Sequence, residues 1–208
     1  ILKEFHVDRQ AKYFNDYVRQ YTDMPMLVRR VKQGDTYVPE RFLRASDFVK
    51  GMGEDNNPEW KTVAYDEASG QIVVPKGSVG FRWGEKGKWS LEEKASGNQE
   101  TRLRLSLSDI KDGTSSVGFP YFGNREHDHF AGTDHPDVLK RNVPTKTLQL
   151  ADGETIVASV FDLFLANYGV DRGFGGIAAK SYADDTPYTP AWQQKITGVK
   201  ADDIISVA

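Results

Sequence analysis

Three histidines lie close together in the sequence and could bind a metal ion. His127, His129 and His135 fall within nine residues, and Asp128 and Asp134 lie beside them. Neutral imidazoles and carboxylates are common ligands of zinc and nickel. The spacing matches no standard metal motif, and solvated histidines in a polar loop are the alternative interpretation. A true site would lose affinity as the pH falls through about 6.5, because only the neutral ring binds metal.

Two glycine-rich stretches could contact phosphate, but each lacks part of the required pattern. Residues 84–88 carry glycine and lysine at a short spacing, and Trp89 follows where a P-loop has Ser or Thr. Residues 172–176 lack the preceding strand and long following helix of a dinucleotide fingerprint. We expect a charged turn between two tryptophan-bearing strands in the first case, and a helix exit with a flexible loop in the second.

Aromatic and basic side chains alternate in one region. Phe81, Arg82 and Trp83 are followed by Lys88 and Trp89. Rings beside cations could form a stacking platform for sugars or single-stranded nucleic acid. Packing between neighbouring strands uses the same residue types. A stand-alone interaction or ligand-binding module is therefore one reading of the chain.

Composition excludes several functional classes. The 208 residues contain no cysteine, so the chain has no disulfide, thiolate nucleophile or cysteine-bound cluster of its own. With 27 basic and 30 acidic residues and a net charge of −3, nothing favours nucleic acid as a partner. No apolar run has the length of a membrane span, which predicts no direct membrane insertion. Serine, histidine and aspartate are present, but no Gly-x-Ser-x-Gly elbow marks a nucleophile.

Helical periodicity predicts helices near both ends of the chain. The first should start at Asp8 as N-cap and end before Pro25, and residues 41–50 should form a short helix closed by Gly51 and Gly53. A stronger helix should follow the turn at residues 151–154 and stop at Gly169. Its apolar face comprises Val157, Val160, Phe161, Phe164, Leu165 and Tyr168. Residues 190–198 and 201–208 complete the predicted helices.

Alternating and turn patterns predict strands between these helices. We expect a strand at residues 26–31, a hairpin of residues 61–65 with 71–74, and a strand at residues 102–108 paired with 88–93. Leu103, Leu105 and Leu107 should form its buried face. Residues 108–143 have little periodicity and are predicted to form a long irregular loop, and residues 145–150 follow it as a short extended segment.

The predicted fold class is α+β, with antiparallel hairpins and a few flanking helices. Because the chain starts at Ile1 and ends at Ala208 within an apolar pattern, we expect one fragment of a larger multidomain subunit. Its parts are a helical lead-in (1–50), a strand-rich insert (51–150) and a helical return segment (151–208). The apolar ends should pack on each other or on a second copy. They comprise Ile1, Leu2, Phe5, Val7, Ile204, Ile205 and Val207.

Several collinear strings, some of them rich in tryptophan, carry a family resemblance. They are residues 56–63 and 80–89, supported by residues 21–28, 117–122, 148–153, 165–169, 188–192 and 196–199. Together they resemble the alpha subunit of membrane-bound respiratory nitrate reductases, in the DMSO-reductase molybdopterin superfamily. Residues 127–138 depart most from that pattern.

The resemblance implies a parent enzyme that reduces nitrate to nitrite in anaerobic respiration. In that family, quinol-derived electrons pass through iron–sulfur clusters to a molybdenum-bis(molybdopterin guanine dinucleotide) centre. The implied partners are the remainder of the alpha subunit, with its [4Fe-4S] cluster, an iron–sulfur beta subunit and a membrane cytochrome b gamma subunit, at the cytoplasmic side of the membrane.

The motifs that carry this chemistry do not occur in these 208 residues. Family members bind the cluster and the molybdenum through residues in an earlier part of the subunit. We therefore assign no catalytic, cofactor-binding or metal residue, and expect the fragment alone to be structural and inactive. A small independent enzyme is a further alternative.

Overall fold

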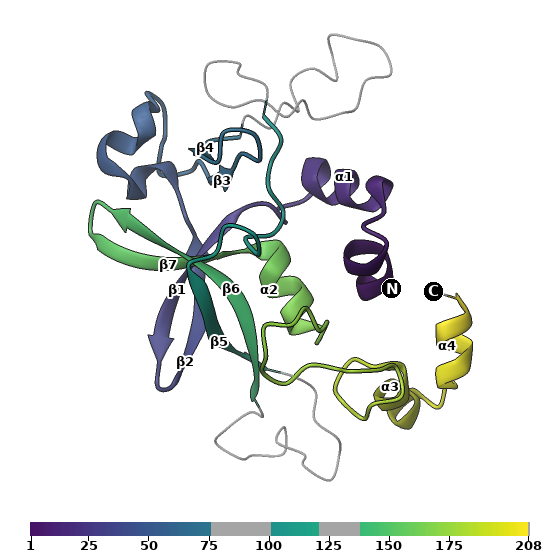
Figure 1. Cartoon of the computed structure of the whole chain (residues 1–208). Coiled ribbons are helices and arrows are strands. Elements are labelled where there is room, and N and C mark those ends of the chain that lie inside the picture. The colour runs from purple at the N-terminus through teal and green to yellow at the C-terminus, as the bar shows by residue number, and fades with distance from the viewer. Residues whose placement is uncertain (76–100, 121–137, 208) are drawn as a thin grey trace, which may run out of the picture.

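The computed structural model describes residues 1–75, 101–120 and 138–207, and Figure 1 shows how their helices and strands are arranged. Within these residues the fold is α+β, as predicted. Five strands close into a barrel, and a separate two-stranded sheet lies beside it. Helices from both ends of the chain lie on one side of this core.

The barrel draws its strands from distant parts of the sequence. They are β1 (Leu27–Gln33), β2 (Thr36–Phe42), β5 (Gly113–Pro120), β6 (Val138–Leu150) and β7 (Gly153–Ser159). They neighbour one another in that order, and β7 pairs with β1 to close the barrel. The pairs are antiparallel except that of β2 with β5, which is parallel and has a single register pair, Tyr37 with Val117. This seam is therefore weakly paired.

The barrel encloses an apolar cluster, and the helix that follows β7 packs against the same cluster. Val28, Val117, Val143 and Ala158 come from four strands and are buried together. The helix α2 (Val160–Asn167) adds Leu163 and Ala166 to the same cluster. Each such side chain contributes about 1.5–3 kcal/mol by leaving water, so this packing fixes α2 against the barrel.

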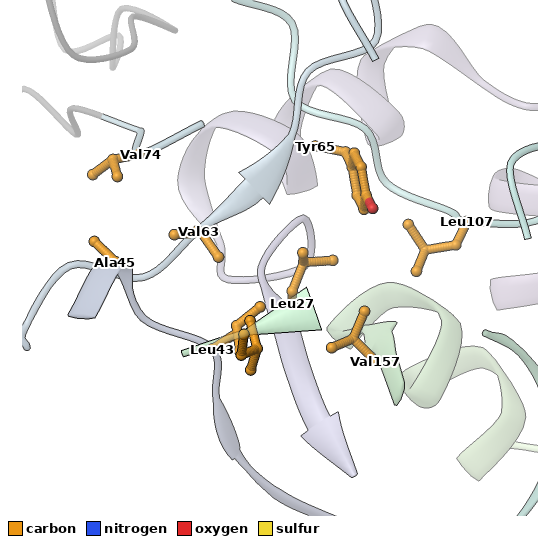
Figure 2. Close-up of a cluster of buried hydrophobic side chains, with 9 residues drawn as sticks. Leu27, Leu43, Ala45, Val63, Tyr65, Val74, Leu107 and Val157 are labelled. Carbon is orange, nitrogen blue, oxygen red and sulfur yellow. The ribbon is translucent and has the colours of Figure 1, made fainter. Parts of the chain in front are cut away.

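A second apolar cluster lies on the outer face of β1 and β7. Leu27 and Val157 point toward Tyr65 and Leu107, as Figure 2 shows. The short strands β3 (Ala64–Tyr65) and β4 (Ile72–Val73) form an antiparallel hairpin over this face. This confirms the hairpin predicted from residues 61–74.

The remaining helices lie toward the two ends of the chain. They are a π-helix (Lys3–Asp8), α1 (Lys12–Tyr21), two 3-10 turns (Ala45–Asp47 and Val49–Gly53), α3 (Pro190–Thr197) and α4 (Ala201–Val207). Leu2, Val7 and Val18 pack on a third cluster formed by Leu105, Phe161 and Leu165. The predicted bounds of α3 and α4 are confirmed, including Gly198 in the left-handed conformation after α3.

Two predicted helix bounds are wrong. Asp8 does not cap α1; it ends the π-helix, the chain turns at Gln10 with a φ of 45°, and Ala11 occupies the N-cap position. In the predicted helix at residues 41–50, the first two residues belong to β2. Only 3-10 turns follow, because Lys50, Gly51 and Met52 have positive φ angles that interrupt a helix.

The loop predicted for residues 108–143 is confirmed at residues 108–112, which form turns and bends, but it is wrong for residues 113–120 and from residue 138 on. Residues 113–120 form β5, and β6 begins at residue 138. Gly113, Thr114, Ser115 and Ser116 have weak apolar periodicity, so the pairing with β6 determines their strand conformation. Residues 121–137 lie outside the described residues.

Two further segments differ from their predictions. Leu103, Leu105 and Leu107 are buried as predicted, but among the described residues their segment pairs only through an isolated bridge between Leu103 and Asp66. The expected partner, residues 88–93, lies outside the described residues. The apolar run predicted as one long helix is divided, since residues 153–159 form β7 and the helix starts at Val160.

Candidate functional site

Most of the chemistry-bearing residues singled out in the sequence lie outside the described residues. These are His127, His129 and His135 with Asp128 and Asp134, the loop at residues 84–88, and Trp83 and Trp89. The metal hypothesis and the aromatic platform therefore stay predictions. In the part of the chain that the structure describes, no group of three or more His, Asp or Glu residues could hold a metal ion.

His6 takes part in packing contacts. Its Nδ1 lies 2.8 Å from Oδ1 of Asn15, and its ring meets Phe14 and Phe161 edge to face.

Within residues 1–75, 101–120 and 138–207, no helix is both long enough and apolar enough to span a membrane.

Residues from the two ends of the chain line one cavity. A cavity of about 830 Å³ is bounded by the first residues, the C-terminal end of α2, residues 179–182, α3 and Ile204 of α4. Its apolar and aromatic walls comprise Ile1, Leu2, Phe164, Tyr168, Val170, Tyr182, Tyr188 and Ile204. Figure 1 shows the two termini on the same side of the molecule. Residues from both predicted apolar ends therefore border one cavity.

Phe164, Tyr168 and Tyr188 form one wall of this cavity and belong to a ladder of aromatic rings that continues to Trp192. Ring centroids are 5.0 Å apart between Phe164 and Tyr168, 5.2 Å between Tyr168 and Tyr188, and 5.3 Å between Tyr188 and Trp192. Burial raises the pKa of Tyr188, and the neighbouring Arg141 only partly offsets this. The phenol is therefore neutral at physiological pH.

Ion pairs lie at the polar rim of the cavity. Lys3 pairs with Asp8, and Nζ of Lys180 lies 2.6 Å from Oδ2 of Asp171. The hydrogen bond from Lys180 holds the pKa of Asp171 below its ordinary value. An apolar interior with a charged rim is the usual anatomy of a protein interface.

Arg141 forms hydrogen bonds with the segments whose aromatic side chains line the cavity. It extends from β6, is 2% exposed and donates only to carbonyl oxygens. Nη1 reaches Ala166 and Asn167 at the C-terminus of α2, Nε reaches Ile177, and Nη2 reaches Pro187. Burial lowers the pKa of Arg141 to about 10, so the side chain stays charged at neutral pH. A cation at a helix C-terminus also interacts favourably with the helix dipole.

Asp162 connects the N-terminal end of α2 to neighbouring segments, as Arg141 does at the C-terminal end. It has no exposed surface, and its carboxylate accepts hydrogen bonds from Ser159 Oγ, Ser106 Oγ and the Leu107 N–H. Nη1 of Arg172 donates to the same carboxylate at 2.7 Å. This ion pair ties the irregular segment at residues 172–176, predicted as a helix exit and loop, to the start of α2.

Sequence reasoning missed both Asp162 and Arg141. A signal for the first was present, since Ser159 three residues before Asp162 is the spacing of a helix N-cap, and Oγ of Ser159 accepts from the Asp162 N–H at 3.0 Å. No comparable signal marks Arg141, because a charged residue in a polar strand normally points toward water.

Comparisons with known proteins identify relatives over the full length of the chain. The respiratory nitrate reductase 2 alpha chain of Escherichia coli (strain K12) is 54% identical over 211 residues, which cover 100% of this chain and 17% of that protein. The nitrate reductase alpha chain of Bacillus subtilis (strain 168) is 39% identical over 210 residues, 100% of this chain and 16% of that protein.

A relative from a third organism has the same relation to the chain. The nitrate reductase alpha subunit of Mycobacterium tuberculosis (strain ATCC 25618 / H37Rv) is 40% identical over 215 residues, 100% of this chain and 16% of that protein. No family model matches the chain. The chain thus spans about one sixth of the length of these relatives. Over its full length the chain is similar to a segment of nitrate reductase alpha chains, and it fits an internal fragment of such a subunit.

Proposed function

We propose that the chain is part of the catalytic alpha subunit of a respiratory nitrate reductase, which reduces nitrate to nitrite. The observation that carries this proposal is the 39–54% identity to nitrate reductase alpha chains over the whole chain. In the parent, a molybdenum-bis(molybdopterin guanine dinucleotide) centre supplies the oxygen-atom transfer chemistry. Electrons come from quinol through a cytochrome b gamma subunit, the iron–sulfur beta subunit and the [4Fe-4S] cluster, on the cytoplasmic side of the membrane.

Within that enzyme, the role of these 208 residues is structural. The buried charges of Asp162, Arg141 and Arg172 are engaged with backbone or with one another. They hold α2 and the loops around it rather than presenting groups to a substrate. We assign no catalytic or cofactor-binding residue to the chain.

The chain acts as one structural unit. Its proposed lead-in (1–50), insert (51–150) and return segment (151–208) each supply at least one strand to the barrel. Removal of any one of the three parts would therefore remove at least one barrel strand.

The cavity between the chain's ends is a docking surface for another part of the same alpha subunit. Its walls are apolar and its rim is charged, and more than four fifths of each relative's length lies outside the matched segment. A cavity of this size would be filled by several large side chains. The remainder of the subunit is the partner that a multidomain protein supplies at fixed stoichiometry.

The proposal predicts that the isolated chain contains no molybdenum and reduces no nitrate with an artificial electron donor. Metal analysis and a nitrite assay on the purified chain measure this, with the complete alpha subunit under the same conditions as the positive control. Near-stoichiometric molybdenum in the isolated chain, or nitrite formation by it, would contradict the structural role. Oligosaccharide binding at Trp83 and Trp89 would instead favour the stand-alone ligand-binding module.

A further inference from the structure

Arg30 is a buried cation inside the barrel. It lies on the same face of β1 as Val28, a member of the barrel cluster, and is 2% exposed. Its Nη1 donates to Ser115 Oγ on β5 at 2.7 Å, and its guanidinium carbon lies 5.6 Å from the centroid of the Tyr37 ring on β2. Three strands of the barrel therefore surround this one charge.

Two donors of Arg30 have no partner. Nε and Nη2 are buried and make no hydrogen bond in the part of the chain that the structure describes, and no carboxylate there forms an ion pair with this guanidinium. Asp162 is the carboxylate whose charge acts on Arg30 at a distance. That carboxylate is bonded to Arg172 and Ser106.

Other buried arginines of the chain show how unusual this arrangement is. Arg19 donates to the Leu103 carbonyl, Asp16 and Glu67. Arg141 donates through all three nitrogens to carbonyl oxygens. At these two arginines the fold supplies partners for the guanidinium group, whereas at Arg30 both donors of one edge, here called the open edge, have none among the described residues.

The open edge has a defined chemical preference. In a guanidinium group, Nε–H and one N–H of Nη2 point in parallel from the same edge, opposite the Nη1 that Ser115 occupies. Two parallel donors of this kind match two oxygens of one oxyanion, with charge assistance. A spherical ion can contact both donors but cannot give each its own acceptor.

We propose that the open edge of Arg30 binds one small monovalent oxyanion inside the barrel, such as formate, bicarbonate or nitrate. One oxygen accepts from Nε and a second from Nη2, and the single negative charge balances the single buried positive charge. Because Arg30 is almost fully enclosed, the occupant is a free ion rather than a carboxylate on another polypeptide segment. The inference is independent of the parent enzyme's activity.

The seam between β2 and β5 provides the entry path. These strands share a single register pair, Tyr37 with Val117, whereas β5 and β6 share eight. Tyr37 lies at this seam and also beside the Arg30 guanidinium. Local opening of the weakest pairing in the barrel would expose the two free donors without unfolding the rest.

Thermal unfolding of the full chain at constant ionic strength tests the site, with chloride replaced stepwise by formate. A ligand that binds only the folded state raises the melting temperature in a concentration-dependent manner. We expect such a rise for the wild-type chain and its loss in Arg30→Met and Arg30→Lys, since lysine keeps the charge but lacks parallel donors. Arg29→Met is the matched control, because Arg29 is a neighbour with its own partners, Glu40 and Asp152. It should retain the rise.

Three further readouts make the test decisive. Benzoate, a bulky carboxylate, should give no rise. If the complete alpha subunit fails to respond while the isolated chain responds, a protein carboxylate occupies the edge and the free-ion proposal is overturned. Should the Arg30 variants not fold, arginine Nε–H spectra of the wild type replace them, and formate should shift one exchange-protected signal. An unchanged melting temperature and spectrum in formate, or an equal rise in Arg30→Met, would overturn the site.

Discussion

Asp162 has no exposed surface; it accepts hydrogen bonds from two serine hydroxyls and a backbone N–H and forms an ion pair with Arg172, whose side chain is 10% exposed. A buried ion pair contributes little when intact, because desolvation offsets the attraction, but removing one partner leaves an uncompensated charge. This asymmetry makes the residue a sensitive probe of the packing around α2.

We predict that Asp162→Ala lowers the free energy of unfolding by about 3–5 kcal/mol, since the largely buried Arg172 loses its carboxylate partner and the Leu107 N–H loses its acceptor. Asp109→Ala is the control. That carboxylate also pairs with an arginine, Arg104, but is 65% exposed, and its loss should cost at most about 1 kcal/mol. Urea unfolding of both variants measures the difference. Equal losses would mean that burial does not determine the strength of these pairs.

The residues that sequence reasoning missed share a physical feature. Asp162, Arg141 and Arg30 are charged, and the default expectation for a charged residue is exposure. Their burial depends on partners that are distant in the sequence, such as Ser106 for Asp162 and Ile177 for Arg141. Local spacing can indicate a helix cap, as at Ser159, but it cannot show which carbonyl oxygens tertiary folding brings to a guanidinium.

Elements with local signals were predicted well. Helix α3 has Pro190 at its first position, Thr189 as a cap and Gly198 after its end, all within ten residues. The hairpin of β3 and β4 is also local, because the turn residues that predict it lie directly between its two strands. By contrast, β2, β5 and much of β6 are polar strands, and the pair Tyr37 with Val117 joins residues that are 80 positions apart in the sequence. The periodicity of apolar residues in the sequence therefore could not predict the closed barrel.

A glycine pair tests how tightly the segment after α2 packs on β6. Gly176 has a φ of +84°, and a Cβ there would lie 2.8 Å from the Asn142 backbone nitrogen. Gly198 has a similar φ of +76°, but a Cβ there would meet nothing within 4 Å. Both positions carry the strain of a left-handed conformation, and only the first adds a collision with backbone.

We predict that Gly198→Ala costs about 1 kcal/mol of the free energy of unfolding, from backbone strain alone. Gly176→Ala should cost about 1–3 kcal/mol more, because the Arg141 strand must shift. Chemical denaturation of the two variants gives the comparison. If both lose the same amount, the loop moves away from β6 without penalty, and the contact with Asn142 is not restrictive.

At the scale of the whole molecule, the barrel joins the two halves of the chain while the cavity lies between its ends. Strands β1 and β2 come from the first fifty residues, and β6 and β7 from beyond residue 137. Ile1 and Leu2 then approach Ile204 at the cavity. Whether copies of the chain associate through these ends stays a prediction, and the cavity offers the rest of the alpha subunit the same apolar surface.

Hydrogen exchange can locate that contact in the complete alpha subunit. We predict that residues 168–171 and 179–182, which line the cavity, exchange their amide hydrogens roughly tenfold more slowly in the complete subunit than in the isolated chain, because docking suppresses local opening. Strand β7, paired on both sides within the barrel, is the internal control and should change far less. Equal slowing of β7 and the cavity segments would indicate general stabilisation rather than docking. Unchanged exchange at the cavity would show that no part of the subunit fills it.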